Sequence, residues 1–291
     1  WMWQENLSVS QVPQVANPDS GFVSSANQTP FNVTAAAENP KESALAPEHG
    51  FQQDMSNRAH RGLELFAALG PMISQEEFSA IKHDKFYSRS TFYVAYLDTI
   101  AVQSFTDPSL QRAQQVLAQW DLGTDVDNTG AALGTCVFLA AERADDRETH
   151  DAQAVADLLG GCVETLLAST GRLDPPWGEV NRHVRGDVNV PVGGGPDILR
   201  AIYGRDLNDD GFLTNVAGDG LYYLVAWDAQ GQLSVEGVHQ FGSATLDDES
   251  PHYNDQALDY ANELLHAPLF DEDALQANLL RAYRPGGELV R

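Results

Sequence analysis

Residues 17–31 have the sequence NPDSGFVSSANQTPF, which is the most informative stretch of the 291-residue chain. Residues 21–24 (GFVS) predict a short strand that runs into a turn at residues 27–30 (NQTP). Asparagine in such a turn usually has only a conformational role. A side-chain amide held beside a developing oxyanion would instead lower a reaction barrier by on the order of 3 kcal/mol. On its own, Asn27 is therefore either a turn residue or an oxyanion donor.

The composition excludes several classes of protein. Apolar residues make up 43% of the chain, which is ordinary for a protein with a packed core. No apolar run is long enough to span a membrane, and residues 1–5 (WMWQE) do not resemble a signal peptide. The formal net charge of −25, from 42 acidic and 17 basic side chains, argues against binding to nucleic acid, which needs clustered Lys and Arg.

Local patterns divide the chain into three segments. Residues 1–57 are rich in Asn, Pro, Ser and Gln, and predict extended segments and loops. Residues 58–170 predict a mainly helical region: one helix begins near Asn57 and stops at Gly70-Pro71. A capping box at residues 74–77 (SQEE) predicts the start of a second helix, and amphipathic helices follow.

Strands are predicted in the third segment, residues 171–291. Residues 171–195 read as a loop, whereas residues 220–227 and 233–238 predict a hairpin around a turn. The C-terminal 40 residues return to helix and end in an exposed tail. The fold class predicted from these patterns is α+β.

The two cysteines do not fix the cellular compartment. Cys136 and Cys162 form no CxxC pair and have no metal-like spacing with histidine. Both lie in apolar, helix-like surroundings, which favours two buried free thiols. A disulfide between them is the alternative.

Four segments, in one order along the chain, resemble the penicillin acylases and acyl-homoserine-lactone acylases. The first is the N-P-x-S-G-F…N-x-x-P pattern of residues 17–31, and the second is Asn57-Arg58-Ala59 at a helix start. The third joins residues 176–182 (PWGEVNR) to residues 190–197 (VPVGGGPD), and the fourth is residues 250–256 (SPHYNDQ). Four short motifs in register rarely arise by chance. Residues 60–170 share with the family only their generally helical character.

The resemblance implies an N-terminal-nucleophile hydrolase with a four-layered αββα sandwich. Such enzymes cut their own precursor into a small and a large chain. The new N-terminal Ser, Cys or Thr attacks the substrate while its α-amine accepts the proton. Asn27 matches the family's oxyanion-stabilising asparagine. Arg58 matches a supporting arginine that orients the substrate or the asparagine, or assists the nucleophile's amine; a surface salt bridge is the alternative.

The nucleophile is expected to lie outside these 291 residues. Trp1 cannot attack a carbonyl, and residues 1–10 contain no evident processing site. We therefore expect the C-terminal part of a large subunit. Its companion chains from the same precursor would be the small subunit and the part of the large subunit that carries the nucleophile. The three segments would then form one structural domain with a partner chain, located, as is usual in this family, in the periplasm or outside the cell.

The remaining motifs are expected to be structural. Residues 206–211 (DLNDDG) imitate a calcium loop, but Ala217 stands where the bidentate Glu should be, which favours a turn. The family often carries a structural Ca²⁺, for which Glu38 is the nearest candidate, and no cofactor is required. His252 and Asp255 read as a hydrogen-bonded corner rather than an acid–base pair. Gly193-Gly194-Gly195 lacks phosphate-loop spacing and predicts close backbone approach.

The predicted reaction is hydrolysis of an amide between an acyl group and an amine-bearing head. The forms of the third and fourth motifs lean toward N-acyl-homoserine lactones, and hence quorum quenching, with β-lactams such as penicillins as side substrates. The alternative is a non-catalytic scaffold or binding protein that retains the fold. An acidic carbohydrate-binding or adhesion domain fits less well, because the aromatic residues are not suitably clustered.

Overall fold

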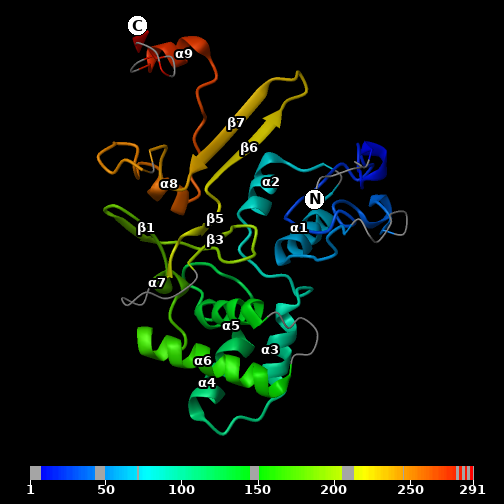
Figure 1. Cartoon of the computed structure of the whole chain (residues 1–291), viewed down its shortest axis with the longest axis vertical. Coiled ribbons are helices and arrows are strands. Elements are labelled where there is room, and N and C mark those ends of the chain that lie inside the picture. The colour runs from blue at the N-terminus through cyan, green and yellow to red at the C-terminus, as the bar shows by residue number, and fades with distance from the viewer. Residues whose placement is uncertain are drawn as a thin grey trace. The chain divides into compact units, whose positions relative to one another are not determined.

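The structure is a computed structural model in which 291 residues form two compact units, Trp1–Asp219 and Gly220–Arg291 (Figure 1). It describes residues 8–42, 50–70, 72–144, 151–204, 213–244, 246–279, 282–283, 286 and 289–290. Helices and small sheets occur together, which confirms the α+β class. The division at residues 57 and 170 stays a prediction. In the described part of the chain, no helix combines the length and the hydropathy that crossing a membrane requires.

The N-terminal part of the first unit is an irregular, hydrogen-bonded segment. It contains the short 3₁₀ helices η1 (Val9–Gln11) and η2 (Ala36–Glu38). The predicted strand at residues 21–24 is wrong. Positive φ angles at Gly21 (+80°) and Asn27 (+60°) turn the chain at both ends of this extended stretch, leaving too short a run for a ladder.

Two predicted helix starts are confirmed. Helix α1 (Asn57–Ala68) begins after Ser56, whose side chain accepts a hydrogen bond from the backbone of Ala59. Helix α2 (Gln75–Lys82) begins with the expected capping box. Ser74 Oγ accepts from Glu77 N at 3.1 Å, and Glu77 Oε2 accepts from Ser74 N at 2.8 Å.

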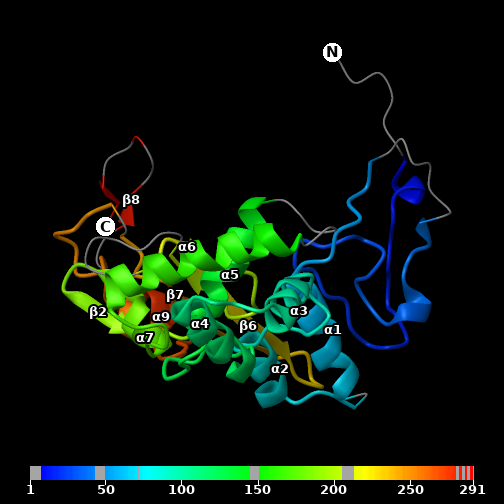
Figure 2. The same cartoon turned by 90° about the horizontal axis from the view of Figure 1, so that it is seen from below.

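The predicted helical region is present and builds the main core. Its helices are α3 (Tyr93–Val102), α4 (Pro108–Gln119), α5 (Ala131–Ala144) and α6 (Ala152–Thr170). They contact one another, and Figure 2 shows α4 and α5 beside α6. The buried side chains between them include Tyr96, Ile100, Leu117, Leu133, Val137, Phe138, Leu159 and Leu166. Apolar burial on this scale supplies most of the stability of such a bundle.

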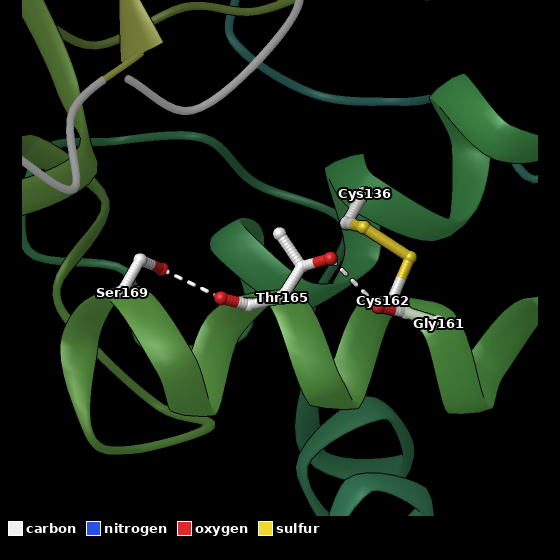
Figure 3. The surroundings of a disulfide bond; sticks show 5 residues. All are labelled: Cys136, Gly161, Cys162, Thr165 and Ser169. Atoms are coloured by element: carbon white, nitrogen blue, oxygen red, sulfur yellow. Dashed lines mark hydrogen bonds between the residues drawn. A yellow bond between two sulfur atoms is a disulfide. The ribbon is translucent and has the colours of Figure 1, made fainter. Parts of the chain in front are cut away.

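A disulfide joins α5 to α6. Cys136 and Cys162 lie 26 residues apart in sequence, with their Cα atoms 5.9 Å apart (Figure 3). The hydroxyls of Thr165 and Ser169, by contrast, bond only to carbonyls of their own helix in this view. The expectation of two free thiols was wrong, because the pairing depends on how two helices pack and not on the local pattern around either cysteine.

Replacing both cysteines by alanine is expected to lower the free energy of unfolding by about 2–4 kcal/mol. The crosslink closes a loop of moderate length, and its loss lets the unfolded chain expand. Urea unfolding of the C136A/C162A variant measures the effect. Wild-type protein in reducing agent should unfold at the same urea concentration as the variant; an unchanged midpoint in both samples would contradict the prediction.

The segment that follows α6 contains more structure than predicted. Helix α7 (Trp177–Val180) leads into β1 (Asn181–Arg185), which pairs antiparallel with β2 (Val188–Pro191). The predicted loop over residues 171–195 was therefore wrong in this part. The sequence of β1, NRHVR, hides the strand because its buried positions hold the polar side chains of Asn181 and His183.

Further short strands complete the first unit. Strand β4 (Leu213–Thr214) adds parallel to β1, and β3 (Ile202–Tyr203) pairs antiparallel with β5 (Ala217–Gly218). The glycine-rich segment before β3 makes the predicted close backbone approach. Gly194 has φ +109°, and a Cβ there would lie 2.4 Å from the carbonyl oxygen of Arg200. Only glycine fits this position.

The second unit contains the predicted hairpin. Strands β6 (Leu221–Trp227) and β7 (Leu233–His239) pair antiparallel in a register that places Val225 opposite Val235. The helices α8 (Ala257–Ala261) and α9 (Glu272–Ala277) follow, and the strand pair β8 (Ala282–Tyr283) and β9 (Leu289–Val290) was not predicted. The ring of Tyr222 contacts that of Tyr260 in α8, with centroids 6.2 Å apart.

Candidate active site

The loop that presents Asn27 is held by the buried side chain of its neighbour, Gln28. The amide nitrogen of Gln28 donates to the carbonyl oxygens of Ser24 and Asn32, each at 3.0 Å. The amide oxygen of Gln28 accepts from the backbone N–H of Ala26. Asn27 itself is exposed and has φ +60°, a conformation in which asparagine is enriched. The loop therefore fixes the backbone of Asn27 and leaves its side chain outside.

The start of α1 is fastened to the same loop. Ser56 Oγ donates to the carbonyl oxygen of Ala26 at 3.0 Å while it caps the helix through Ala59. The backbone N–H of Thr29 donates to the carbonyl oxygen of Asp54 at 2.9 Å. These bonds place the first turn of α1, and hence Arg58, beside Asn27.

The structure brings the two predicted site residues into contact. Arg58 Nη2 donates to Asn27 Oδ1 at 3.1 Å. Because a guanidinium can only donate, the atom of Asn27 that faces it must be the oxygen. The amide nitrogen, Nδ2, then remains on the other side as a donor. This is the orientation that an oxyanion donor needs.

Arg58 is itself held by an acidic residue far along the chain. Arg58 Nε donates to Asp197 Oδ1 at 3.2 Å, and the two side chains are 30% and 20% exposed. The planar guanidinium can make this contact and the one to Asn27 together, because its donors point in different directions. Sequence reasoning placed Asp197 in a family-like motif but gave it no role. Its contacts to the start of α1 join residues far apart in the sequence, so no local signal marks its role.

Asp197 also contacts the beginning of α1. Its Oδ2 accepts from the backbone N–H of Asn57 at 2.7 Å, and its carbonyl oxygen accepts from Asn57 Nδ2 at 2.7 Å. A carboxylate at a helix N-terminus satisfies a free N–H group and is favoured by the helix dipole. Burial raises the pKa of Asp197, while the hydrogen bonds from Asn57 and Arg58 oppose that rise.

Two buried side chains, those of Tyr87 and Asn57, hold the backbone around Asp197. The hydroxyl of Tyr87 donates to the carbonyl oxygen of Pro196 at 2.8 Å, and Asn57 Oδ1 accepts from the backbone of Ser88 at 2.8 Å. Burial raises the pKa of Tyr87, so this hydroxyl keeps its proton at neutral pH. Asp197 has φ +50°, an uncommon conformation for a residue with a side chain. The hydrogen bonds of Asp197 with Asn57 and Arg58, and that of Pro196 with Tyr87, hold it in this conformation.

A polar cavity of about 350 Å³ opens beside these groups. Asn27, Gln52, Arg58, Asp197 and Tyr203 are among its lining residues. Its volume falls in the range of small-molecule sites. A substrate carbonyl near Asn27 Nδ2 would therefore meet a hydrogen-bond donor at the edge of a cavity large enough for a polar head group.

Glu38 is the metal-ligand candidate that lies within the described residues. The carboxylate of Glu38 accepts from the backbone N–H groups of Asp19 and Ser20, and hydrogen bonding from Ser20 lowers its pKa. The described ranges contain no group of three His, Cys, Asp or Glu side chains placed to hold a metal ion. Because Ca²⁺ takes six to eight oxygen ligands, a structural Ca²⁺ at Glu38 stays a prediction that needs most of its ligands from outside this chain. Residues 206–211 lie outside the described residues.

His252 and Asp255 form a corner of the second unit. His252 Nδ1 lies 2.8 Å from Asp255 Oδ2, with both side chains more than a third exposed. The carbonyl oxygen of His252 accepts from the backbone N–H of Ala244 at 3.0 Å, and a Cβ on Gly242 would lie 2.2 Å from that oxygen. The pair thus belongs to a tight backbone crossing, which accounts for the motif without acid–base chemistry.

Comparison with known proteins identifies the fold and the family of the chain. The fold is similar to that of a thermostable penicillin G acylase from Alcaligenes faecalis, with a TM-score of 0.52 and 13% sequence identity. The likeness covers 98% of this chain and 60% of that one, so this chain spans about 60% of the length of that enzyme chain. The sequence matches the Penicillin amidase family over residues 1–277. The chain belongs to the penicillin amidase family.

Proposed function

We propose that this chain is part of an amide hydrolase in which Asn27 Nδ2 stabilises the oxyanion of the tetrahedral intermediates. The observation that carries the proposal is the 3.1 Å hydrogen bond from Arg58 to Asn27 Oδ1. It fixes the amide with its donor turned away from the guanidinium. Membership of the penicillin amidase family supports the reaction class.

The nucleophile would be the N-terminal Ser, Cys or Thr of a companion chain. Its α-amine takes the proton from the hydroxyl or thiol as the oxygen or sulfur attacks the amide carbon. The carbonyl oxygen becomes an oxyanion held by Asn27 and by donors of the companion chain. Transfer of the proton to the amine nitrogen releases the amine, and water then hydrolyses the acyl-enzyme through the same oxyanion site.

A nucleophile outside these 291 residues, on a companion chain of the same precursor, is compatible with the length comparison, since the chain spans about 60% of the related enzyme chain. Mass spectrometry of the purified enzyme tests this part of the proposal. We expect this chain together with other chains of one precursor. A single 291-residue species with full activity would contradict it.

Arg58 would act through both its charge and its geometry. Its guanidinium lies in the first turn of α1, where a positive charge is disfavoured by the helix dipole. The contacts of Arg58 with Asn27 and Asp197 offset this unfavourable interaction. The positive charge also favours the developing negative charge on a nearby substrate oxygen.

N-acyl-homoserine lactones are the proposed substrates, which would make the enzyme a quorum-quenching acylase. Penicillins are proposed as secondary substrates. The support comes from the forms of two motifs, residues 177–182 and 250–256. The polar cavity beside Asn27 is compatible with a polar head group, because Gln52, Arg58 and Tyr203 offer it hydrogen bonds.

The substrate proposal predicts a definite order of reactivity. The complete enzyme should release free homoserine lactone from long-chain N-acyl-homoserine lactones with a larger kcat/KM than it releases the β-lactam amine from penicillin G. Quantifying both amines by mass spectrometry checks this. The reverse order would assign the enzyme to the penicillin branch. Failure to cleave either substrate or simpler acyl amides would favour a scaffold that retains the fold.

A periplasmic or extracellular location is also proposed. The Cys136–Cys162 disulfide supports it, because such bonds persist in oxidising compartments and are rare in the cytosol. Alkylation of cysteines in intact cells, followed by mass spectrometry, should find both residues protected. Free thiols in freshly lysed cells would argue against export.

A further inference from the structure

The position of Arg58 beside Asn27 needs an explanation of its own. An arginine side chain loses rotamer entropy when it is fixed. The helix dipole disfavours a cation in the first turn of α1. The neutral amide oxygen of Asn27 is a modest partner, and Arg58 remains 30% exposed to competing water. A further group must therefore select the conformation in which Nη2 reaches Asn27.

We infer that Asp197 is a positioning residue for the oxyanion site. Its carboxylate holds Arg58 Nε, so that Arg58 Nη2 faces Asn27 Oδ1 and Asn27 Nδ2 is turned toward the substrate carbonyl. Asp197 need not touch the substrate, because it acts through Arg58. The inference rests on the proposed function of Asn27.

The geometry at Asp197 suits this role. One carboxylate oxygen accepts from Arg58 and the other from the backbone of Asn57, so rotation of the carboxylate would break both bonds. The backbone of Asp197 is pinned as well, since its carbonyl oxygen accepts from Asn57 and the neighbouring Pro196 accepts from Tyr87. The start of α1, the Asp197 carboxylate and the Arg58 guanidinium are thus joined by hydrogen bonds.

The chain provides a matched control on the same helix. Arg61, about one turn beyond Arg58, forms a bidentate pair with Asp84 at 2.9 and 2.8 Å. The Asp84 side chain is 10% exposed, so this pair is at least as buried as the one at Asp197. Neither residue of the pair contacts Asn27 in the described contacts. Removing the Asp84 charge perturbs α1 to a similar degree without releasing Arg58.

The D197N variant of the complete enzyme tests the inference. Asparagine tolerates the positive φ of this position. Its NH₂ group cannot accept a hydrogen bond, so the side chain can accept from Arg58 or from the backbone of Asn57 but not from both through separate oxygens. We expect kcat to fall roughly tenfold, less than complete loss of an oxyanion donor, with KM changed by less than about twofold. The D84N variant should lose thermal stability but keep kcat within about twofold. Equal kcat for D197N and D84N would overturn the inference.

A double-mutant cycle examines the route through Arg58. The R58K variant leaves the Asp197 carboxylate on Asn57 and keeps the positive charge, but it removes the rigid planar fork whose Nε and Nη2 bond Asp197 and Asn27 in fixed directions. If Asp197 acts through Arg58, the kcat losses of R58K and D197N do not multiply in the double variant, whereas those of R58K and D84N do. Losses of R58K and D197N that multiply would overturn the route. If D197N fails to fold, R58K provides the test in its place. A kcat of R58K equal to that of the wild type would then overturn the inference.

Two further observations separate this inference from the proposed function. A crystal structure of D197N should show Arg58 withdrawn from Asn27, and an unchanged contact would overturn the positioning role whatever the activity. If N27A lowers kcat but D197N matches D84N, only the positioning role fails. If N27A leaves kcat unchanged, the oxyanion assignment itself fails.

Discussion

Replacing Asn27 by alanine is expected to lower the kcat of the complete enzyme about 10²–10³-fold, with little change in KM. Alanine removes the Nδ2 donor, which stabilises charge that exists in the transition state but not in the bound substrate. The loss should therefore appear in the chemical steps. Steady-state kinetics with a cleaved acyl amide, together with a burst experiment that separates acylation from deacylation, measure it.

A second asparagine supplies the control for this variant. Asn17 has φ +48°, is exposed, and lies in the same N-terminal segment as Asn27, whose φ is +60°. Alanine in the left-handed region costs roughly 1–2 kcal/mol at either position. The N17A variant should therefore lose comparable stability yet keep its kcat. If N27A and N17A had the same kcat, Asn27 would be a turn residue and nothing more.

The family resemblance singled out half of the candidate site, and local patterns placed those residues on a turn and at a helix start. Asn27 and Arg58 stand 31 residues apart, and each lies in a short pattern: a turn before proline for one, a predicted helix start for the other. Ser56 explains why the two residues lie side by side, because its hydroxyl caps α1 and also donates to the carbonyl oxygen of Ala26 in the loop. Family-like motifs supplied the chemistry that these patterns alone left open.

The rest of the site depends on contacts that no local pattern reveals. Asp197 lies 139 residues from Arg58 in sequence, and its place at the start of α1 follows from the packing of the glycine-rich loop. Asn181 is a similar case: its buried amide bonds the carbonyl oxygens of Val192 and Ile202, so a polar residue occupies a strand interior. Periodicity of apolar residues cannot predict such a strand.

Replacing Trp177 by alanine is expected to lower the free energy of unfolding by about 3–5 kcal/mol, the range for a fully buried aromatic residue. Trp177 is 0% exposed, and its indole Nε1 donates to the carbonyl oxygen of Gly194 at 2.7 Å. The substitution removes both the packed volume and this bond. Urea unfolding followed by circular dichroism measures the change. The W227A variant is the control, because Trp227 is 66% exposed and its loss should change stability by less than about 1 kcal/mol.

The bond to Gly194 also connects the core to the candidate active site, and a milder variant removes this bond alone. Phenylalanine at position 177 keeps most of the volume but removes the donor. Within the described residues, the carbonyl oxygen of Gly194 then keeps the longer bond from Asn181 at 3.4 Å. A loss of about 1–3 kcal/mol is expected for the weakened buried acceptor. Because Gly194 lies three residues before Asp197, a folded W177F enzyme should also show a lower kcat if the loop positions that carboxylate. A destabilised enzyme with unchanged kcat would show that the loop's packing and its alignment of Asp197 are independent.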